Sequence, residues 1–127
     1  MFSHVSIGSK NPNEAAKFYD EVLGTLGIGT LFNVSGAVAY GTPTGPKTFI
    51  LKPFNGEAPM AGNGGHVAYL AGSRAEVDAF YATALKLGGT DEGAPGLRPQ
   101  YHQNYYGAYV RDPEGNKLQA VCHSKNG

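Results

Sequence analysis

Two stretches of the chain carry apolar side chains at helical spacing. In the first stretch they recur at i, i+3, i+4, i+7 and i+8: Ala15, Phe18, Tyr19, Val22 and Leu23. The second stretch repeats this spacing 62 positions later: Val77, Phe80, Tyr81, Ala84 and Leu85. Such spacing places one apolar stripe along a helix, so each stretch is predicted to form an amphipathic helix that packs on a core.

Residues that favour helix ends flank both stripes. Asn11 suits an N-cap, and Glu14, three residues later, completes a pattern like a capping box. Ser73 and Glu76 form the same pattern before the second stripe. Gly24 follows the first stripe and is expected to end that helix.

Short segments with strand character surround the predicted helices. The expected strands are 2–7, 30–34, 37–41, 48–52, 105–111 and 117–123. The segment 93–99 is rich in glycine and proline and is interpreted as the place where the second half has a longer connection. Pro-x-Gly turns between the strands favour tight antiparallel connections.

The two halves also match residue by residue. His4-Val5 recurs as His66-Val67 at the same offset of 62 as the helical stripes. Each half is therefore predicted to be a strand–helix–strand–strand–strand module within one α+β domain. Module one covers about residues 1–54, a linker rich in Gly, Asn and Pro covers 55–65, and module two covers about 66–123.

Composition and charge narrow the function classes. The 127 residues carry 10 basic and 10 acidic side chains, so a nucleic-acid partner is not expected. No apolar run is long enough to span a membrane, and the start lacks a basic, apolar leader, which favours a cytoplasmic location. The single cysteine, Cys122, excludes an intramolecular disulfide and is expected to face the helices.

Two motifs carry a resemblance to a known family. The paired His-Val strands and the segment Asp112-Pro113-Glu114-Gly115-Asn116-Lys117 resemble the vicinal oxygen chelate superfamily, which includes glyoxalase I, bleomycin-resistance proteins and extradiol dioxygenases. The resemblance implies two tandem βαβββ modules that form a curved mixed sheet, with helices on the convex side. It also implies a small-molecule site on the concave side and a homodimer.

The resemblance also implies metal-ligand positions, one on the first and one on the last strand of each module. They match His4, His66 and Gln119, and the fourth position falls on Phe49 or Leu51. Side-chain alternation independently turns both histidines and the glutamine away from the helices. Zn²⁺, Ni²⁺, Co²⁺ or Fe²⁺ would suit a site with two imidazoles. The alternative interpretation is that both histidines are hydrogen-bonded residues of a metal-free pocket, because the positions supply no carboxylate.

The segment 97–106 is a second candidate site. Arg98 offers a guanidinium for an anionic group, and nearby phenol and imidazole rings offer stacking surface and hydrogen bonds. The candidate substrate-binding residues are Arg98, Tyr101, His102, Tyr105 and Tyr109. The alternative is a polar loop whose tyrosines pack locally or contact a second chain.

Two functions are compatible with these residues. The first is a metal-dependent lyase or isomerase, similar to glyoxalase, that acts on a small carbonyl compound or thiol conjugate. The second is a non-catalytic protein, similar to bleomycin-resistance proteins, that binds a small molecule in the cup. No residue is assigned a catalytic role, since Gln119 cannot accept a proton as a carboxylate base would.

Overall fold

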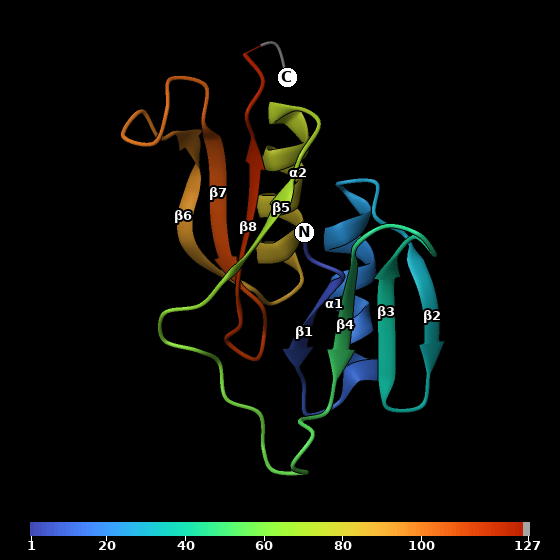
Figure 1. The fold of residues 1–127 in the computed structure, drawn as a ribbon. Helices are drawn as coiled ribbons and strands as arrows, with labels where there is room; N and C mark the ends of the chain where they lie inside the picture. The colour runs from blue at the N-terminus through green and yellow to red at the C-terminus, as the bar shows by residue number, and fades with distance from the viewer. Residues whose placement is uncertain (126–127) are drawn as a thin grey trace.

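The computed structural model describes residues 1–125 of the chain. Figure 1 shows ten elements in two groups along the chain. The first group is β1 (His4–Gly8), α1 (Pro12–Gly24), β2 (Thr30–Val34), β3 (Ala37–Gly41) and β4 (Lys47–Leu51). The second group is β5 (Val67–Leu70), α2 (Arg74–Lys86), β6 (Thr90–Leu97), β7 (Tyr106–Arg111) and β8 (Lys117–Cys122).

Each group forms one βαβββ module, as the sequence repeat predicts. The strand order is β1-β4-β3-β2 in the first sheet and β5-β8-β7-β6 in the second. In both sheets the first and last strands of the module pair in parallel, and the other neighbours pair antiparallel. The predicted α+β fold class is confirmed, with the strands of residues 1–125 divided between two four-stranded sheets.

The predicted capping residues start both helices. The Asn11 side chain accepts the backbone N–H of Glu14 at 3.2 Å, and the Ser73 hydroxyl accepts that of Glu76 at 3.1 Å. Each contact satisfies one of the N–H groups that a helix leaves unpaired in its first turn. The apolar stripes then bury their large side chains, with Phe18 and Phe80 almost inaccessible to solvent.

The interpretation of residues 93–99 as a connection is wrong for most of that segment. Residues 90–97 form β6, which pairs with β7 through Gly93 opposite Tyr109 and Gly96 opposite Gly107. The pairing shifts register twice along this strand, so the extra residues are absorbed as irregularities of the ladder. Glycine and proline, which normally predict a turn, mark these irregularities instead.

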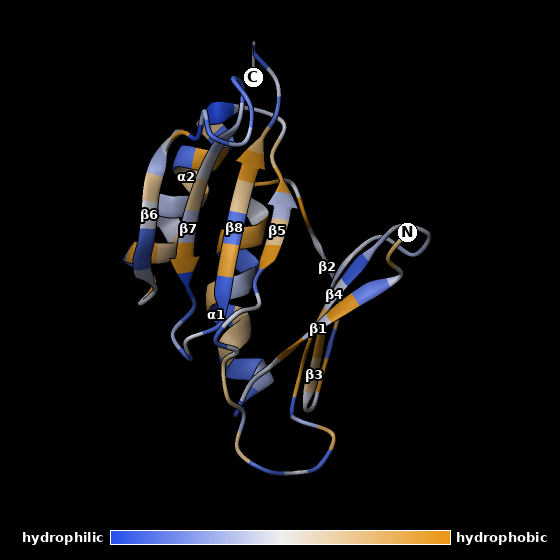
Figure 2. Cartoon of the chain, turned by 60° about the vertical axis from the view of Figure 1, so that its left-hand side comes forward, coloured by the Kyte–Doolittle hydropathy of each residue, from blue (hydrophilic) through white to orange (hydrophobic). Residues whose placement is uncertain are grey.

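The two helices pack against each other, and each also packs on the sheet of its own module. Long-range contacts fix this arrangement: the Tyr19 hydroxyl of α1 donates to Asp112 after β7, at 2.5 Å. The hydroxyls of Thr48 in β4 and Tyr69 in β5 also contact each other, at 3.1 Å. Figures 1 and 2 show that the helix-free faces of the two sheets point in diverging directions. Within one chain these faces therefore do not enclose a shared cup.

The connection between the modules runs from the end of β4 at Leu51 to the start of β5 at Val67. Phe54 and Met60 in this connection are almost fully exposed. Among residues 1–125, no helix is both long and apolar enough to cross a membrane.

Candidate functional site

The helix-free face of the second sheet brings together most of the predicted site residues. The register places Ala68, Gln119 and Tyr109 side by side on β5, β8 and β7. His66 directly precedes β5. Gln119 is only 1% exposed although it lies on the outer face of the sheet, so other side chains must cover it.

Those covering side chains hold the Gln119 amide at both ends. The His66 Nε2 atom lies 3.0 Å from Gln119 Oε1, and Gln119 Nε2 donates to the Tyr105 hydroxyl at 2.5 Å. Because an amide oxygen only accepts hydrogen bonds, His66 carries its proton on Nε2 in this contact. The result is a hydrogen-bonded chain, His66–Gln119–Tyr105, that crosses three neighbouring segments.

A glycine makes room for this chain. A Cβ atom at Gly107 would lie 3.2 Å from Gln119 Nε2 and 3.3 Å from Tyr105 Cε1. Both distances are tighter than ordinary van der Waals contact, so any larger residue would displace the amide or the phenol. Gly107 therefore belongs to the site, although sequence analysis did not select it.

Tyr109 forms the centre of the aromatic surface next to Gln119. Its ring centroid lies 5.8 Å from that of His66, 5.8 Å from the Arg98 guanidinium carbon and 5.2 Å from Lys117 Nζ. Burial raises the pKa of Tyr109 to about 12, and interaction with Tyr105 adds to the effect. The phenol is therefore neutral at physiological pH and remains able to donate a hydrogen bond.

The loop before β7 adds an outer ring of aromatic residues. The Tyr105 ring lies 4.9 Å from that of Tyr101 and 5.4 Å from that of His102, measured between centroids. His102 Nε2 contacts His123 Nδ1 at 2.8 Å, and its Nδ1 atom accepts the Asn104 N–H at 3.1 Å. Strand alternation from Gln119 predicts His123 on the same face, but its place near the C-terminus favours a solvated residue, and its contact with His102 was not expected.

Arg98 also lies beside Tyr109, but its guanidinium hydrogen-bonds to β6, the strand that directly precedes it. Its two terminal nitrogens donate to the carbonyl oxygens of Gly96 at 2.9 Å and Ala94 at 2.8 Å. These bonds hold the cation beside the Tyr109 ring. Its expected role as a grip for an anionic ligand stays a prediction.

His4 lies apart from the other predicted residues, on the first sheet. Its Nδ1 atom contacts the Ser3 hydroxyl at 2.9 Å, and its ring meets the edge of Phe49 at 4.9 Å between centroids. Phe49 pairs with Ser6 as Gln119 pairs with Ala68, so Phe49 is the counterpart of Gln119. This register resolves the alternative between Phe49 and Leu51, and it places an apolar ring at the fourth position.

The donor set of one chain does not fit a divalent cation. His4 and His66 lie on faces that diverge, and the Gln119 amide is bonded at both ends. The His66 nitrogen that faces Gln119 carries a proton and offers no lone pair. Within residues 1–125 there is also no group of three His, Cys, Asp or Glu side chains that could hold a metal ion.

The repeated module and its two helix-free faces define a class of two-module α+β proteins. The family model of the Glyoxalase/Bleomycin resistance protein/Dioxygenase superfamily matches residues 1–120, and the chain belongs to this superfamily. No curated protein matches the sequence significantly.

Solved structures agree with this assignment. A glyoxalase/bleomycin resistance protein from Albidiferax ferrireducens T118 is 40% identical, with a TM-score of 0.86 over 98% of this chain and 99% of its own. A glyoxalase-related enzyme from Fulvimarina pelagi is 19% identical, with a TM-score of 0.75 over 96% of this chain and 87% of its own. A lactoylglutathione lyase from Agrobacterium tumefaciens is 18% identical, with a TM-score of 0.65 over 96% of this chain and 92% of its own. The last two similarities show the fold alone.

Proposed function

We propose that this protein binds a small organic molecule on the helix-free face of the second sheet, around Gln119. The observation that carries the proposal is the His66–Gln119–Tyr105 chain, a buried amide whose position is fixed before any ligand arrives. Fixed polar groups beside aromatic surface are typical of small-molecule sites, because little ordering remains to be done on binding.

The chemistry of the face favours a planar ligand that is neutral or anionic. The rings of Tyr105 and Tyr109 offer stacking surface. Lys117 and Arg98 lie next to the Tyr109 ring and give the face a positive charge. A cationic ligand would be repelled there.

A second copy of the chain is proposed to close the site as a homodimer. The helix-free face of the first sheet carries exposed apolar residues, with Phe32 41% and Val34 54% accessible. On the second sheet, Leu70 is 74% accessible. Since the faces diverge within one chain, the first sheet of one copy can cover the second sheet of another, which buries these residues.

A metal-dependent lyase or isomerase for a carbonyl compound or thiol conjugate is the second candidate. It is favoured by the equivalent placement of two histidines. Val67 pairs with Leu118 in the second module as Val5 pairs with Thr48 in the first. His66 directly precedes Val67, as His4, which lies opposite Lys47, directly precedes Val5. It requires that a second copy bring His4 to His66 and that the Gln119 amide be released from its partners.

One set of measurements separates the two candidates. Ligand-observed NMR with a panel of aromatic carboxylates and phenols tests binding to the wild type, Gln119→Leu and Tyr81→Phe, a control on α2 whose hydroxyl donates to Asp91. We expect at least a tenfold loss of affinity in Gln119→Leu, because His66 and Tyr105 lose their shared partner, and no loss in the control.

Metal content is measured on the same protein after incubation with Zn²⁺, Ni²⁺, Co²⁺ and Fe²⁺ and gel filtration. Retention of about one metal ion per chain, lost in both His4→Ala and His66→Ala, supports the lyase or isomerase and contradicts a metal-free binding site. Equal ligand affinity in the wild type and Gln119→Leu contradicts the placement of the site.

A further inference from the structure

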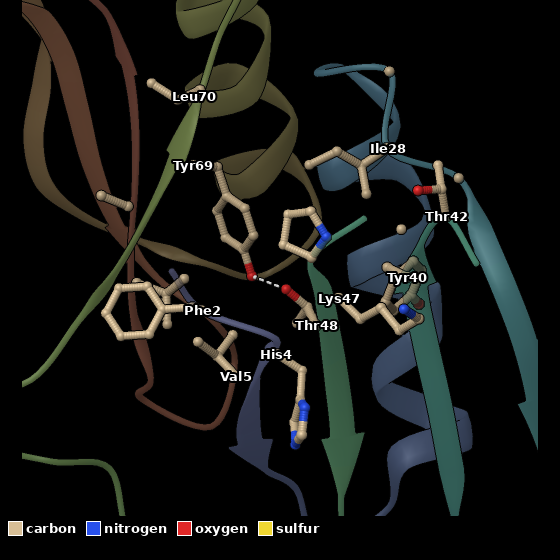
Figure 3. Close-up of a pocket in the computed structure, with 16 residues that line it drawn as sticks. Phe2, His4, Val5, Ile28, Tyr40, Thr42, Lys47, Thr48, Tyr69 and Leu70 are labelled. Atoms are coloured by element: carbon tan, nitrogen blue, oxygen red, sulfur yellow. Dashed lines mark hydrogen bonds between the residues drawn. The ribbon is translucent and has the colours of Figure 1, made fainter. Parts of the chain in front are cut away.

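A cavity lies between the two modules, and Gln119, His66, Tyr105 and Tyr109 are not among the residues that line it. Its volume is about 550 Å³, within the range of small-molecule pockets. It is bounded by the start of β1, the segment before β2, the start of β4 and the whole of β5 (Figure 3). Thr48 and Tyr69 line it from the helix side of their sheets, whereas Gln119 lies on the opposite side.

The wall of this cavity is mostly apolar. Its apolar side chains come from four segments that are distant in sequence: Phe2, Val5, Ile28, Pro46, Val67 and Leu70. Phe2 is 71% and Leu70 74% accessible, so the cavity keeps a large apolar rim in contact with water. Filling it with an apolar group removes this surface from water, which is favourable at about 25 cal/mol per Å².

One hydrogen-bond donor inside the cavity is unused. The Tyr69 and Thr48 hydroxyls contact each other at 3.1 Å, and neither has another hydrogen-bond partner among the described residues. Two hydroxyls carry two hydrogens, and their mutual bond uses only one. Burial raises the pKa of Tyr69 to about 12, so the phenol keeps its proton at physiological pH. The remaining hydrogen is therefore available to an acceptor on a bound molecule.

Lys47 is the one lysine, arginine, aspartate or glutamate among the described lining residues, whereas the carboxylate of Asp112 acts on Tyr69 from outside the lining. Lys47 Nζ donates to the carbonyl oxygens of Pro43 at 3.1 Å and Gly45 at 3.0 Å, which leaves the third ammonium hydrogen for another acceptor. Figure 3 shows the His4 ring pointing away from the Tyr69 hydroxyl, so His4 contributes little to the polar end.

We propose that this cavity binds a small apolar carboxylic acid, with its hydrocarbon or aromatic body against Ile28, Val67 and Phe2. Its carboxylate then accepts the free hydrogen of the Thr48–Tyr69 pair, and Lys47, held at the turn of residues 43–45, attracts its charge from the rim of the cavity. The site differs from the proposed function in its polar groups, because Thr48, Tyr69 and Lys47 take no part in the Gln119 cluster, although Ala68 and Leu70 border both.

Calorimetric titration with octanoate tests the proposal. Octanol has a hydrocarbon chain of the same length but no charge, and it serves as the control ligand. Lys47→Met is expected to weaken octanoate binding about fivefold to tenfold and to leave octanol binding unchanged. Tyr69→Phe is expected to weaken octanoate by a similar factor. Tyr81→Phe removes a phenol hydroxyl that donates to Asp91 outside the cavity, and it is expected to leave both affinities unchanged.

Thr48→Val provides a second route to the hydroxyl pair if Tyr69→Phe does not fold. Octanoate affinity that is equal in the wild type, Lys47→Met and either hydroxyl variant would overturn the proposal, since the acid would then bind elsewhere. Absence of saturable octanoate binding to the wild type would overturn it as well. Neither result changes the expectation for Gln119→Leu, so the two proposals fail separately.

Discussion

Removal of the Tyr19 hydroxyl tests the contact that joins the two modules. Tyr19 on α1 is 1% exposed and donates to Asp112 Oδ2, and Asp112 is 4% exposed in the turn between β7 and β8. Burial, followed by the charge of Asp112, raises the pKa of Tyr19 well above its ordinary value, so the phenol is neutral and acts as the donor. Asn116 Nδ2 donates to the same carboxylate oxygen at 2.9 Å and remains after the change.

Tyr19→Phe keeps the ring and creates no large cavity, so the cost is mainly that of one hydrogen bond to a buried charged group. Such bonds contribute about 1.5–3 kcal/mol, and we expect a loss of about 2 kcal/mol. Tyr40→Phe is the matched control, because its hydroxyl donates to the exposed Asp20 at 2.7 Å. A bond to an exposed partner is replaced readily by water, and we expect a loss below about 1 kcal/mol.

Urea unfolding followed by circular dichroism measures both variants, with a common slope as evidence that the unfolded state is unchanged. A double-mutant cycle of Tyr19→Phe with Asp112→Asn then isolates the pair. A loss in Tyr19→Phe no greater than in Tyr40→Phe, or a coupling energy below about 0.5 kcal/mol, would refute the assignment of this bond as a tie between the modules.

Three further predictions concern pH, packing and capping. Burial raises the pKa of Tyr69 to about 12, so the folded chain keeps a proton that the unfolded chain loses near pH 10. Stability should therefore fall between about pH 10 and 12, by up to about 1.4 kcal/mol per pH unit from this group, and Tyr69→Phe should flatten the fall in urea titrations. Gly89→Ala places a Cβ atom 2.8 Å from the backbone oxygens of both Ala84 and Arg111. This crowding should lower the free energy of unfolding by about 2–3 kcal/mol, measured by thermal unfolding. An unchanged free energy of unfolding would contradict this packing. Asn11→Ala removes the side-chain cap of α1 and should lower the free energy of unfolding by about 1 kcal/mol. Asn11→Ser keeps a capping oxygen and should leave the free energy of unfolding nearly unchanged.

The helices and most strands could be predicted from the sequence because their signals are local. The apolar stripes and the caps at Asn11 and Ser73 each lie within one or two turns of the helix that they define. The β6 strand was not predicted, because Gly93 and Gly96 favour a turn when read alone. Only the paired strand β7 supplies the hydrogen bonds that make this segment extended.

The candidate site could be predicted in part. Side-chain alternation alone placed His66 and Gln119 on the same face, and the structure joins them at 3.0 Å. The partnership of Gln119 with Tyr105 depends on the path of the loop before β7 and on the space left by Gly107. Neither is encoded by a periodic pattern, since both depend on how separate segments meet.

The sequence by itself therefore determined the repeat of two βαβββ modules, the start of each helix and the shared face of His66 and Gln119. Only the tertiary structure decided that the two helix-free faces diverge, which separates His4 from His66 within one chain. The physical reason is that module orientation depends on contacts between residues far apart in sequence, such as Tyr19 with Asp112 and Gly8 with Asn116. Local propensities determine single elements, whereas the packing of buried groups from both modules determines how those elements face one another.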